Sequence, residues 1–216
     1  TDFSIRTFIG GYDKNFTYLI TCRKTNTQIL IDAAIDIKHI LPFINNEKAY
    51  LLITHTHNDH IAYINQYFNF LSDLTIIGHP KSNFNKKQKI KYIDINDNQW
   101  FKIGELNFKS IHTPGHYYDS ICYQINPVLF TGDTLFVGRT GRVISSKSNI
   151  NHLYNSIYKK ILTLDNEIRI YPGHHYGDKV TVKICENIKL SPLLQAKNLD
   201  EFIFLMEQFE KSRTSN

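Results

Sequence analysis

The sequence predicts an α+β protein in which β-sheets are packed inside helices. Short runs of alternating or continuous apolar residues, typical of strands, recur in residues 3–32, 49–54 and 100–131. Segments with apolar residues at helical spacing follow these runs, and turns rich in glycine or proline separate them. Each β-rich half is thus closed by helices, which favours an architecture with the sheets as the inner layers.

The first half begins with three expected strands and then alternates helices with strands. Ala49–Thr54 is apolar throughout, which is typical of a strand that is buried on both faces. The expected strands are Phe3–Ile9, Phe16–Cys22, Gln28–Asp32, Ala49–Thr54 and Thr75–His79, and the expected helices are Asp36–Ile44 and His60–Leu71.

The second half repeats this organisation after a lysine-rich segment. The expected strands are Trp100–Ile103, Leu106–Ile111, Ile121–Ile125, Val128–Thr131 and Ile168–Tyr171, and the expected helices are Asn149–Leu164 and Leu199–Phe209. We therefore expect a single domain over residues 1–216 with a short C-terminal helical segment at about 181–211.

Composition excludes several classes of protein. Hydrophobic residues make up 42% and charged residues 21% of the 216 residues, which argues against disorder. No apolar run approaches the ~18 residues that span a bilayer, and the N-terminus has no signal-peptide core. The three cysteines are far apart and form no CxxC pair, which fits a reducing compartment. We expect a cytoplasmic protein that is not attached to a membrane.

The net charge of +5 is concentrated in one segment. Lys81–Lys91 contains five lysines and no acidic residue, so the rest of the chain is neutral overall. A solvated surface loop explains this segment, and the alternative is attraction of an anionic substrate or of RNA.

A dense group of metal-binding residues follows the buried strand Ala49–Thr54. The motif His55-Thr56-His57-Asn58-Asp59-His60 has the pattern HxHxDH. His55 and His57 are two residues apart in an extended turn and can converge on one ion, whereas Asp59 and His60 can face a second ion. Imidazole and carboxylate ligands suit zinc, iron or manganese.

Three further strand ends each provide a ligand-type residue. His116 follows a Pro-Gly turn in TPGH, Asp133 ends TGD, and His174 follows a second Pro-Gly turn in YPGH. Because polar residues at strand ends and glycine turns are typical of functional sites, these residues together predict one metal site.

The motifs HTHNDH, TPGH, TGD and PGH resemble the metallo-β-lactamase superfamily, and the resemblance spans Phe3 to about Leu194. It implies an αββα sandwich with the metal site at the edge between the two sheets. FTGDTLFVGRTGR and YPGHHYG are most similar to glyoxalase II-like (hydroxyacylglutathione hydrolase-like) enzymes and the related persulfide dioxygenases. The implied first metal site is His55, His57 and His116, the implied second site is Asp59, His60 and His174, and Asp133 bridges the two.

This resemblance implies a metallohydrolase that cleaves thioesters. A hydroxide bridging two divalent ions (zinc, with iron or manganese as alternatives) would attack the carbonyl, with Asp59 and Asp133 as the catalytic carboxylates. A thiolate has a conjugate-acid pKa near ~8.5 and leaves without a strong general acid, whereas an amide nitrogen needs a proton.

Three residues are the expected contacts to an anionic thioester or another thiol-derived small molecule. Arg139 and Arg142 lie in GRTGR shortly after Asp133, and Tyr176 follows His174. In the resemblance, Arg142 takes the place of a substrate-binding lysine. Glyoxalase II has a longer C-terminal helical domain that binds glutathione, so the identity of the thiol carrier stays open.

Two other activities remain open from the sequence. A persulfide dioxygenase would hold one Fe(II) through His55, His116 and Asp133, a triad of two histidines and one carboxylate. An RNA-processing nuclease is weaker, because only the lysine segment supports nucleic-acid binding.

Overall fold

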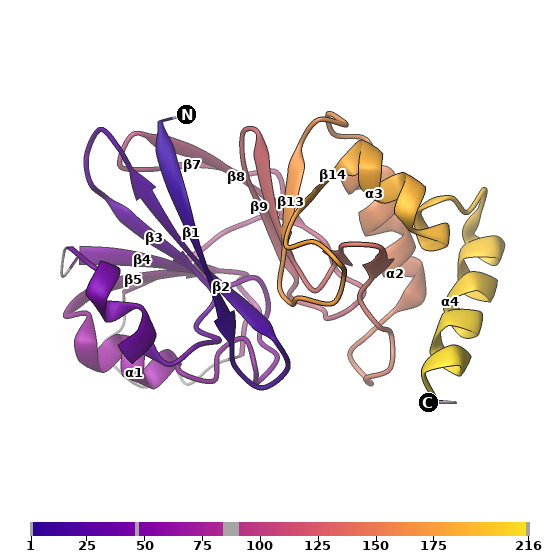
Figure 1. The fold of residues 1–216 in the computed structure, drawn as a ribbon, viewed down its shortest axis with the longest axis horizontal. Coiled ribbons are helices and arrows are strands. Elements are labelled where there is room, and N and C mark those ends of the chain that lie inside the picture. Colours follow the sequence, from indigo (N-terminus) through magenta and orange to yellow (C-terminus); the bar gives the residue numbers. More distant parts are fainter. Residues whose placement is uncertain (1, 46–47, 84–90, 215–216) are drawn as a thin grey trace.

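Two β-sheets face each other and helices cover their outer faces, which makes a four-layered αββα sandwich (Figure 1). The computed structural model of the protein describes residues 2–45, 48–83 and 91–214. The expected fold class is confirmed.

The first sheet has six strands in the described part of the chain, in the order β1-β2-β3-β4-β5-β6. They are β1 (Phe3–Gly10), β2 (Asn15–Cys22), β3 (Gln28–Ile31), β4 (Lys48–Leu52), β5 (Asp73–Gly78) and β6 (Lys91–Asp94). The first three are antiparallel, and β3 to β6 are parallel. The C-terminal ends of the parallel strands therefore lie along one edge of the sheet.

The second sheet also has six described strands, in the order β14-β13-β10-β9-β8-β7. They are β7 (Trp100–Ile103), β8 (Leu106–His112), β9 (Ile121–Ile125), β10 (Val128–Gly132), β13 (Arg169–Pro172) and β14 (Val182–Lys183), with a separate hairpin of β11 (Leu135–Phe136) and β12 (Arg139–Thr140). Because β10 is parallel to β13, and β9 lies antiparallel between β8 and β10, the strands β8, β10 and β13 all end at the same edge.

Backbone hydrogen bonds join the two sheets at this edge. The Phe16 N–H donates to the Gly173 carbonyl at 2.8 Å, and the Ile121 N–H donates to the Thr54 carbonyl at 2.7 Å. These bonds fix the strand ends of one sheet against those of the other.

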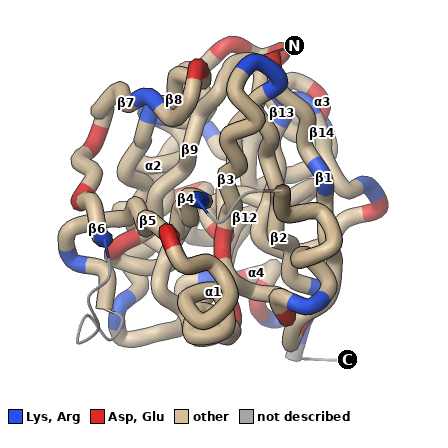
Figure 2. The backbone as a smooth tube through the Cα atoms, turned by 90° about the vertical axis from the view of Figure 1, so that its left-hand side faces the viewer, with Lys and Arg blue, Asp and Glu red and all other residues tan. Residues whose placement is uncertain are grey.

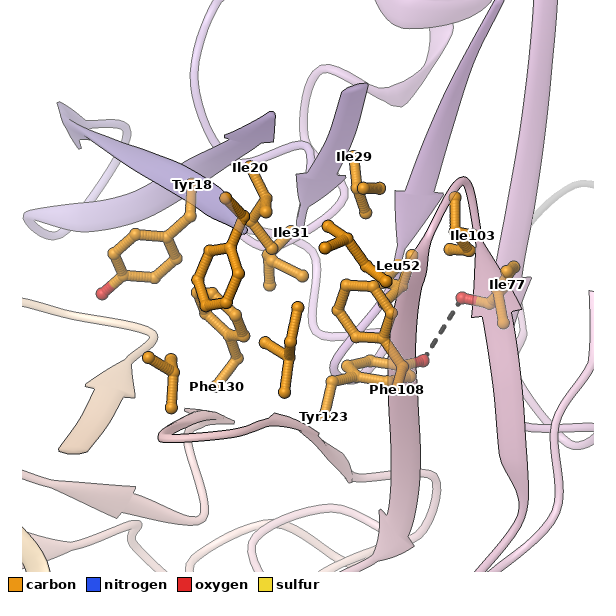
Figure 3. Packing of buried hydrophobic residues seen from close by; sticks show 14 of the residues in the cluster. Tyr18, Ile20, Ile29, Ile31, Leu52, Ile77, Ile103, Phe108, Tyr123 and Phe130 are labelled. Carbon is orange, nitrogen blue, oxygen red and sulfur yellow. Dashed lines mark hydrogen bonds between the residues drawn. The ribbon is translucent and has the colours of Figure 1, made fainter. Parts of the chain in front are cut away.

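The central core fills the space between the sheets with large apolar and aromatic side chains (Figure 3). Tyr18 from β2, and Phe108 and Phe130 from the second sheet, are almost fully buried. Tyr123 also links the two sheets by hydrogen bonds, because its hydroxyl donates to the carbonyls of Ile53 at 2.8 Å and Ile77 at 3.3 Å. Burial of these rings is the main source of stability for the inner two layers.

Two outer apolar clusters attach the helices. Helix α1 (Ile64–Phe70) and two short 3₁₀ turns at Ile37–His39 and Leu41–Phe43 pack on the first sheet. The second sheet is covered by α2 (Ile150–Ser156), which continues as a π turn over Ile157–Ile161, and by α3 (Ile184–Leu190), a 3₁₀ turn at Pro192–Leu194 and α4 (Leu199–Thr214).

The helix expected over Asp36–Ile44 is wrong in type. Asp36 accepts a hydrogen bond from the Lys38 N–H and begins one 3₁₀ turn, and Leu41-Pro42-Phe43 forms another. Pro42 has no N–H and disfavours helical geometry at the residue before it, so a continuous α-helix cannot form. The helix expected over His60–Leu71 begins only at Ile64. Most of the lysine segment Lys81–Lys91 lies outside the described residues.

Charge is mixed over the visible side of the molecule. Lysine and arginine positions are interspersed with acidic ones in Figure 2, including along the side that carries β6. Across the ranges that the structure covers, no helix combines the length and apolarity needed to cross a bilayer.

We expect Phe130→Ala to lower the free energy of unfolding by about 3–5 kcal/mol, because it leaves a cavity between the sheets. Phe204→Ala is the matched control, since Phe204 on α4 is 58% exposed and should change stability by less than ~0.5 kcal/mol. Urea unfolding followed by circular dichroism measures both. Equal losses in the two variants would contradict the assignment of the core.

Candidate metal centre

The metal-binding residues predicted from sequence converge at the edge where the strands end. His55 and His57 lie in the loop after β4, and His116 follows β8 through the Pro-Gly turn. Asp133 follows β10 and His174 follows β13. Strands from both sheets thus contribute ligands to one site.

The first group of ligand atoms comes from three histidines and one carboxylate: His55, His57, His116 and Asp133. His55 Nε2 lies 3.0 Å from His57 Nδ1, and His116 Nε2 lies 2.9 Å from the same atom. Asp133 Oδ2 is 3.5 Å from His116 Nε2. These atoms surround one point.

The second group comprises Asp59, His60 and His174, and Asp133 lies beside it as well. The Nε2 atoms of His60 and His174 are 3.1 Å apart, and Asp59 Oδ2 is 3.2 Å from His174 Nε2. Asp133 Oδ1 is 3.1 Å from His60 Nε2 and its Oδ2 is 3.3 Å from His174 Nε2. The Asp133 carboxylate therefore lies between the two groups.

These spacings fit bound metal ions. Ligands about 2.0–2.1 Å from a tetrahedral ion are roughly 3.4 Å from one another, close to the separations seen here. Asp133 Oδ1 is buried without a hydrogen-bond donor among the described residues, although ring nitrogens lie near it. Buried carboxylates and imidazoles gathered in this way are typical ligands of zinc, iron and manganese, so the residues fit two such ions.

Hydrogen bonds on the outer side fix three of the histidine rings. The Nδ1–H of His60 donates to Asp32 Oδ2 at 2.8 Å, and that of His116 donates to the Arg142 carbonyl at 2.8 Å. The Nδ1–H of His174 donates to the Asp13 carbonyl at 2.7 Å. Each bond leaves Nε2 unprotonated in the neutral ring and turns it toward the centre, as in known metal sites.

Three supporting residues were missed from the sequence. Buried Asp32 also accepts from Thr54 N–H and Oγ1, both at 2.7 Å. Asn15 donates to Asp59 Oδ2 at 2.8 Å, and Asp119 accepts from Thr56 Oγ1 at 2.7 Å. The sequence offered a signal for Asp32, because it lies at the end of an expected strand, as Asp133 does. Asn15 and Asp119 carry no such pattern.

Two glycines permit the close approach of the ligand loops. Gly115 has φ +145°, and a Cβ there would lie 2.3 Å from the backbone of Leu153. A Cβ at Gly173 would lie 2.3 Å from Asp133 Oδ1. The glycine before each of His116 and His174 is therefore required by space, and at Gly115 also by the backbone geometry.

The two groups differ in how they hold protons before an ion binds. Burial lowers the pKa of His55, and it lowers the pKa of His57 to about 4. Burial alone would also lower the pKa of His60 and His174, but Asp133 with Asp32 or Asp59 outweighs it, raising His174 to about 9. At pH 7 the three histidines of the first group are therefore uncharged, whereas His60 and His174 of the second group hold an extra proton.

Two of the expected substrate contacts, Tyr176 and Arg139, lie beside the second group, whereas the carbonyl of the third, Arg142, is bonded to His116 of the first. The Tyr176 ring stacks on His174 at 4.8 Å and 3°, and its hydroxyl donates to Asp13 Oδ2 at 2.5 Å. The Arg139 guanidinium lies 4.0 Å above the Tyr176 ring. Arg142 binds Glu210 on α4, with Nε 2.9 Å and Nη2 2.5 Å from Oε2.

We expect affinity for the second ion to fall more steeply with acid than affinity for the first. Ligands must lose protons to bind metal, and His174 and His60 have raised pKa values whereas His55 and His57 have lowered ones. Between pH 8 and pH 6 the second affinity should drop roughly tenfold per pH unit for each proton displaced. Competition with a chromophoric chelator measures both constants, and equal pH slopes would contradict the assignment.

Comparison with known proteins agrees with this geometry. The profile described as the metallo-β-lactamase superfamily matches residues 10–174. A probable hydroxyacylglutathione hydrolase of Schizosaccharomyces pombe is 30% identical over 196 residues, covering 85% of this chain and 72% of the relative. A probable polyketide biosynthesis zinc-dependent hydrolase, BaeB, of Bacillus velezensis is 27% identical over 192 residues, covering 88% of this chain and 85% of that protein. The crystal structure of ETHE1 from Myxococcus xanthus matches with a TM-score of 0.81 and 28% identity, over 95% of this chain and 91% of that one. The chain therefore belongs to the metallo-β-lactamase superfamily.

Proposed function

We propose that this protein is a metal-dependent hydrolase of anionic thioesters. The observation that carries the proposal is the position of Asp133, whose two oxygens lie 3.1–3.5 Å from ring nitrogens of both ligand groups. A carboxylate placed in this way can serve two ions at once. The similarity to hydroxyacylglutathione hydrolases supports the choice of substrate class.

The residues account for the requirements of the reaction. Two divalent ions (zinc, with iron or manganese as alternatives) would supply Lewis acidity and a water acidic enough to act as nucleophile near neutral pH. Asp133 and Asp59 act as the catalytic carboxylates by holding these ions, and Asn15 orients Asp59. Because a thiolate leaves without a strong acid, the reaction needs no proton donor outside the ligand set.

Recognition of the anionic thiol carrier is assigned to Arg139, with Tyr176 and Arg142 beside it. Arg139 Nε is buried and has no hydrogen-bond partner among the described residues, so this guanidinium keeps an unmatched donor. Burial, and after it the nearby Arg213, lowers the pKa of Arg139, while Tyr176 and Asp13 act in the opposite direction. The Arg142 guanidinium is already paired with Glu210, so its contribution to recognition comes from its place beside Arg139 and not from a free charge.

Glutathione is one such carrier, but the relatives do not decide between carriers. One acts as a probable hydroxyacylglutathione hydrolase, and another as a probable polyketide biosynthesis hydrolase. The proposal therefore specifies an anionic thioester, and cytoplasmic location stays a prediction.

A mononuclear iron persulfide dioxygenase is the second candidate. Its triad of two histidines and one carboxylate is present, because His55, His116 and Asp133 gather in the first ligand group. The same residues fit both reactions, so the number of bound ions separates them.

Metal content and substrate turnover test the proposal together. We expect about two ions per chain in protein purified without oxygen or added metal, and hydrolysis of S-lactoylglutathione or a related anionic thioester. Thiol release is measured colorimetrically. One iron per chain with oxygen uptake on glutathione persulfide, and without thioester hydrolysis, would replace the hydrolase with the dioxygenase.

We expect Asp133→Asn to lower both metal content and kcat by at least about 100-fold, because losing a ligand should cost more than the 10–100-fold seen for losing an outer hydrogen bond. Asp200→Asn, at an exposed position in the first turn of α4, is the control and should keep both properties. Emission spectrometry and a thioester assay give the two readouts. Wild-type turnover in Asp133→Asn would refute the role of this carboxylate.

We expect Arg139→Met to raise KM roughly tenfold for a thioester of an anionic thiol while leaving KM for a neutral thiol nearly unchanged, because a buried charge-assisted hydrogen bond is lost. Arg6→Met is the matched control and should change neither KM. Arg6 lies on β1 in the first sheet, with its guanidinium 3.9 Å over the ring of Phe43. Equal changes for the two substrates would make Arg139 structural.

A further inference from the structure

A cleft lies beside the first ligand group. Its volume is about 430 Å³, and it is lined by residues that follow β5 and β8 and by the loop before α2. Gly115, which precedes the ligand His116, and Ser148, whose hydroxyl donates to the His116 carbonyl at 2.8 Å, are both in its wall. The cleft therefore adjoins the metal centre.

Aromatic rings and one lysine connect the cleft to the ligands. The Tyr117 ring lies 4.1 Å from the His57 ring and 4.8 Å from the ring of Tyr118, which lines the cleft. The Lys147 ammonium lies 5.6 Å from the Tyr117 centroid and 5.3 Å from that of Tyr118. A substrate group that passes over Tyr117 from the metal centre meets this positive charge and then the cleft.

The described lining of the cleft is basic and contains no Asp or Glu. It holds Lys81, Lys147, His79, His112 and His152. Three acids lie behind this lining. Asp119 is buried and accepts from Thr56 and Ser82, Asp97 accepts from the His112 N–H and is paired with Lys160, and Asp94 is close enough to His79 to affect its pKa.

One of these histidines is prepared to donate a hydrogen bond. His79 Nδ1 accepts from the Lys81 N–H at 3.1 Å, so the neutral ring carries its proton on Nε2. The His79 ring is stacked on His112 at 4.3 Å, and His112 Nε2 donates to the Tyr118 carbonyl at 3.0 Å. Burial lowers the pKa of His79 to about 4 and also lowers that of His112, so the positive charge in this part of the lining comes from the two lysines.

We propose that this cleft binds a carboxylate or phosphate on the part of the substrate that lies over the first ligand group. Arg139 and Tyr176 lie on the other side of the centre, beside His174. The proposal rests on the proposed thioester hydrolysis and adds a substrate class: thioesters that are anionic on both sides of the scissile bond. Two lysines and a neutral N–H donor suit such a group.

The test uses the metal-loaded enzyme and a pair of substrates that share one neutral thiol. Succinyl and butyryl thioesters differ only by the terminal carboxylate. We expect the wild type to have a KM for the succinyl thioester roughly five- to tenfold below that for the butyryl thioester, and Lys81→Met/Lys147→Met to remove this preference. Lys102→Met/Lys109→Met removes the same charge from the β7–β8 hairpin, where Lys109 lies over Trp100, and should keep the preference.

Added inorganic phosphate distinguishes the two anions. If the cleft takes phosphate, phosphate competes with the succinyl thioester in the wild type and the control, and competition is lost in Lys81→Met/Lys147→Met. Competition that persists equally in all three proteins assigns phosphate to another site, and a preference for succinyl thioester then supports a carboxylate in the cleft.

Two failures are distinguishable. Hydrolysis of both thioesters with the same KM ratio in the wild type and Lys81→Met/Lys147→Met overturns the cleft and leaves the hydrolase. Absence of hydrolysis overturns the proposed function, and calorimetric titration with succinate and phosphate then decides on the cleft alone. Weaker binding only in Lys81→Met/Lys147→Met supports it, and equal binding in the three proteins overturns it.

Discussion

Five imidazoles and two carboxylates lie within a few ångströms of one another at the edge of the sandwich, and the surrounding structure depends on this close approach. Such a cluster loses hydration on burial and is stable only where its charges and lone pairs are matched. Before an ion binds, protons on His60 and His174 offset the charge of Asp133, which explains the raised pKa values there. Bound cations would replace these protons. Metal binding and proton release are therefore one linked equilibrium in this protein.

Much of the site could be predicted from the sequence, because the direction of each strand determines where the candidate ligand after it lies. All seven ligands follow strands whose C-terminal ends share one edge, so position along the chain implied position in space. The supporting residues could not be predicted in this way. Asp119 lies 63 residues beyond Thr56 and 37 beyond Ser82, and only tertiary packing brings them together. The pairing of the Arg142 guanidinium with Glu210, which is 68 residues away, likewise depends on tertiary packing, and a role for Arg142 at the substrate stays a prediction.

The fold was predicted where burial decides the structure and less well where local chemistry does. Apolar runs such as Leu51-Leu52-Ile53 identify inner strands because they are buried on both faces. The short strands β11, β12 and β14 have two residues each, which is too few to show a periodic pattern in the sequence. Residues 36–44 form two 3₁₀ turns and not the expected helix, although their apolar spacing is helical. The missing N–H of Pro42 outweighs an amphipathic pattern in so short a segment.

The C-terminal helix α4 is linked to the metal centre through Arg142. Glu210 on α4 holds the Arg142 guanidinium, and the backbone carbonyl of Arg142 accepts the Nδ1–H of the candidate ligand His116. This pairing neutralises Arg142, whereas Arg139 keeps a buried Nε without a partner among the described residues. In the proposed function, recognition of an anionic carrier would therefore fall to one guanidinium beside the second ligand group, and the lysines of the cleft lie beside the first. Under the two proposals, a substrate that spans Asp133 would meet positive charge at both ends, which would favour doubly anionic thioesters over singly charged ones.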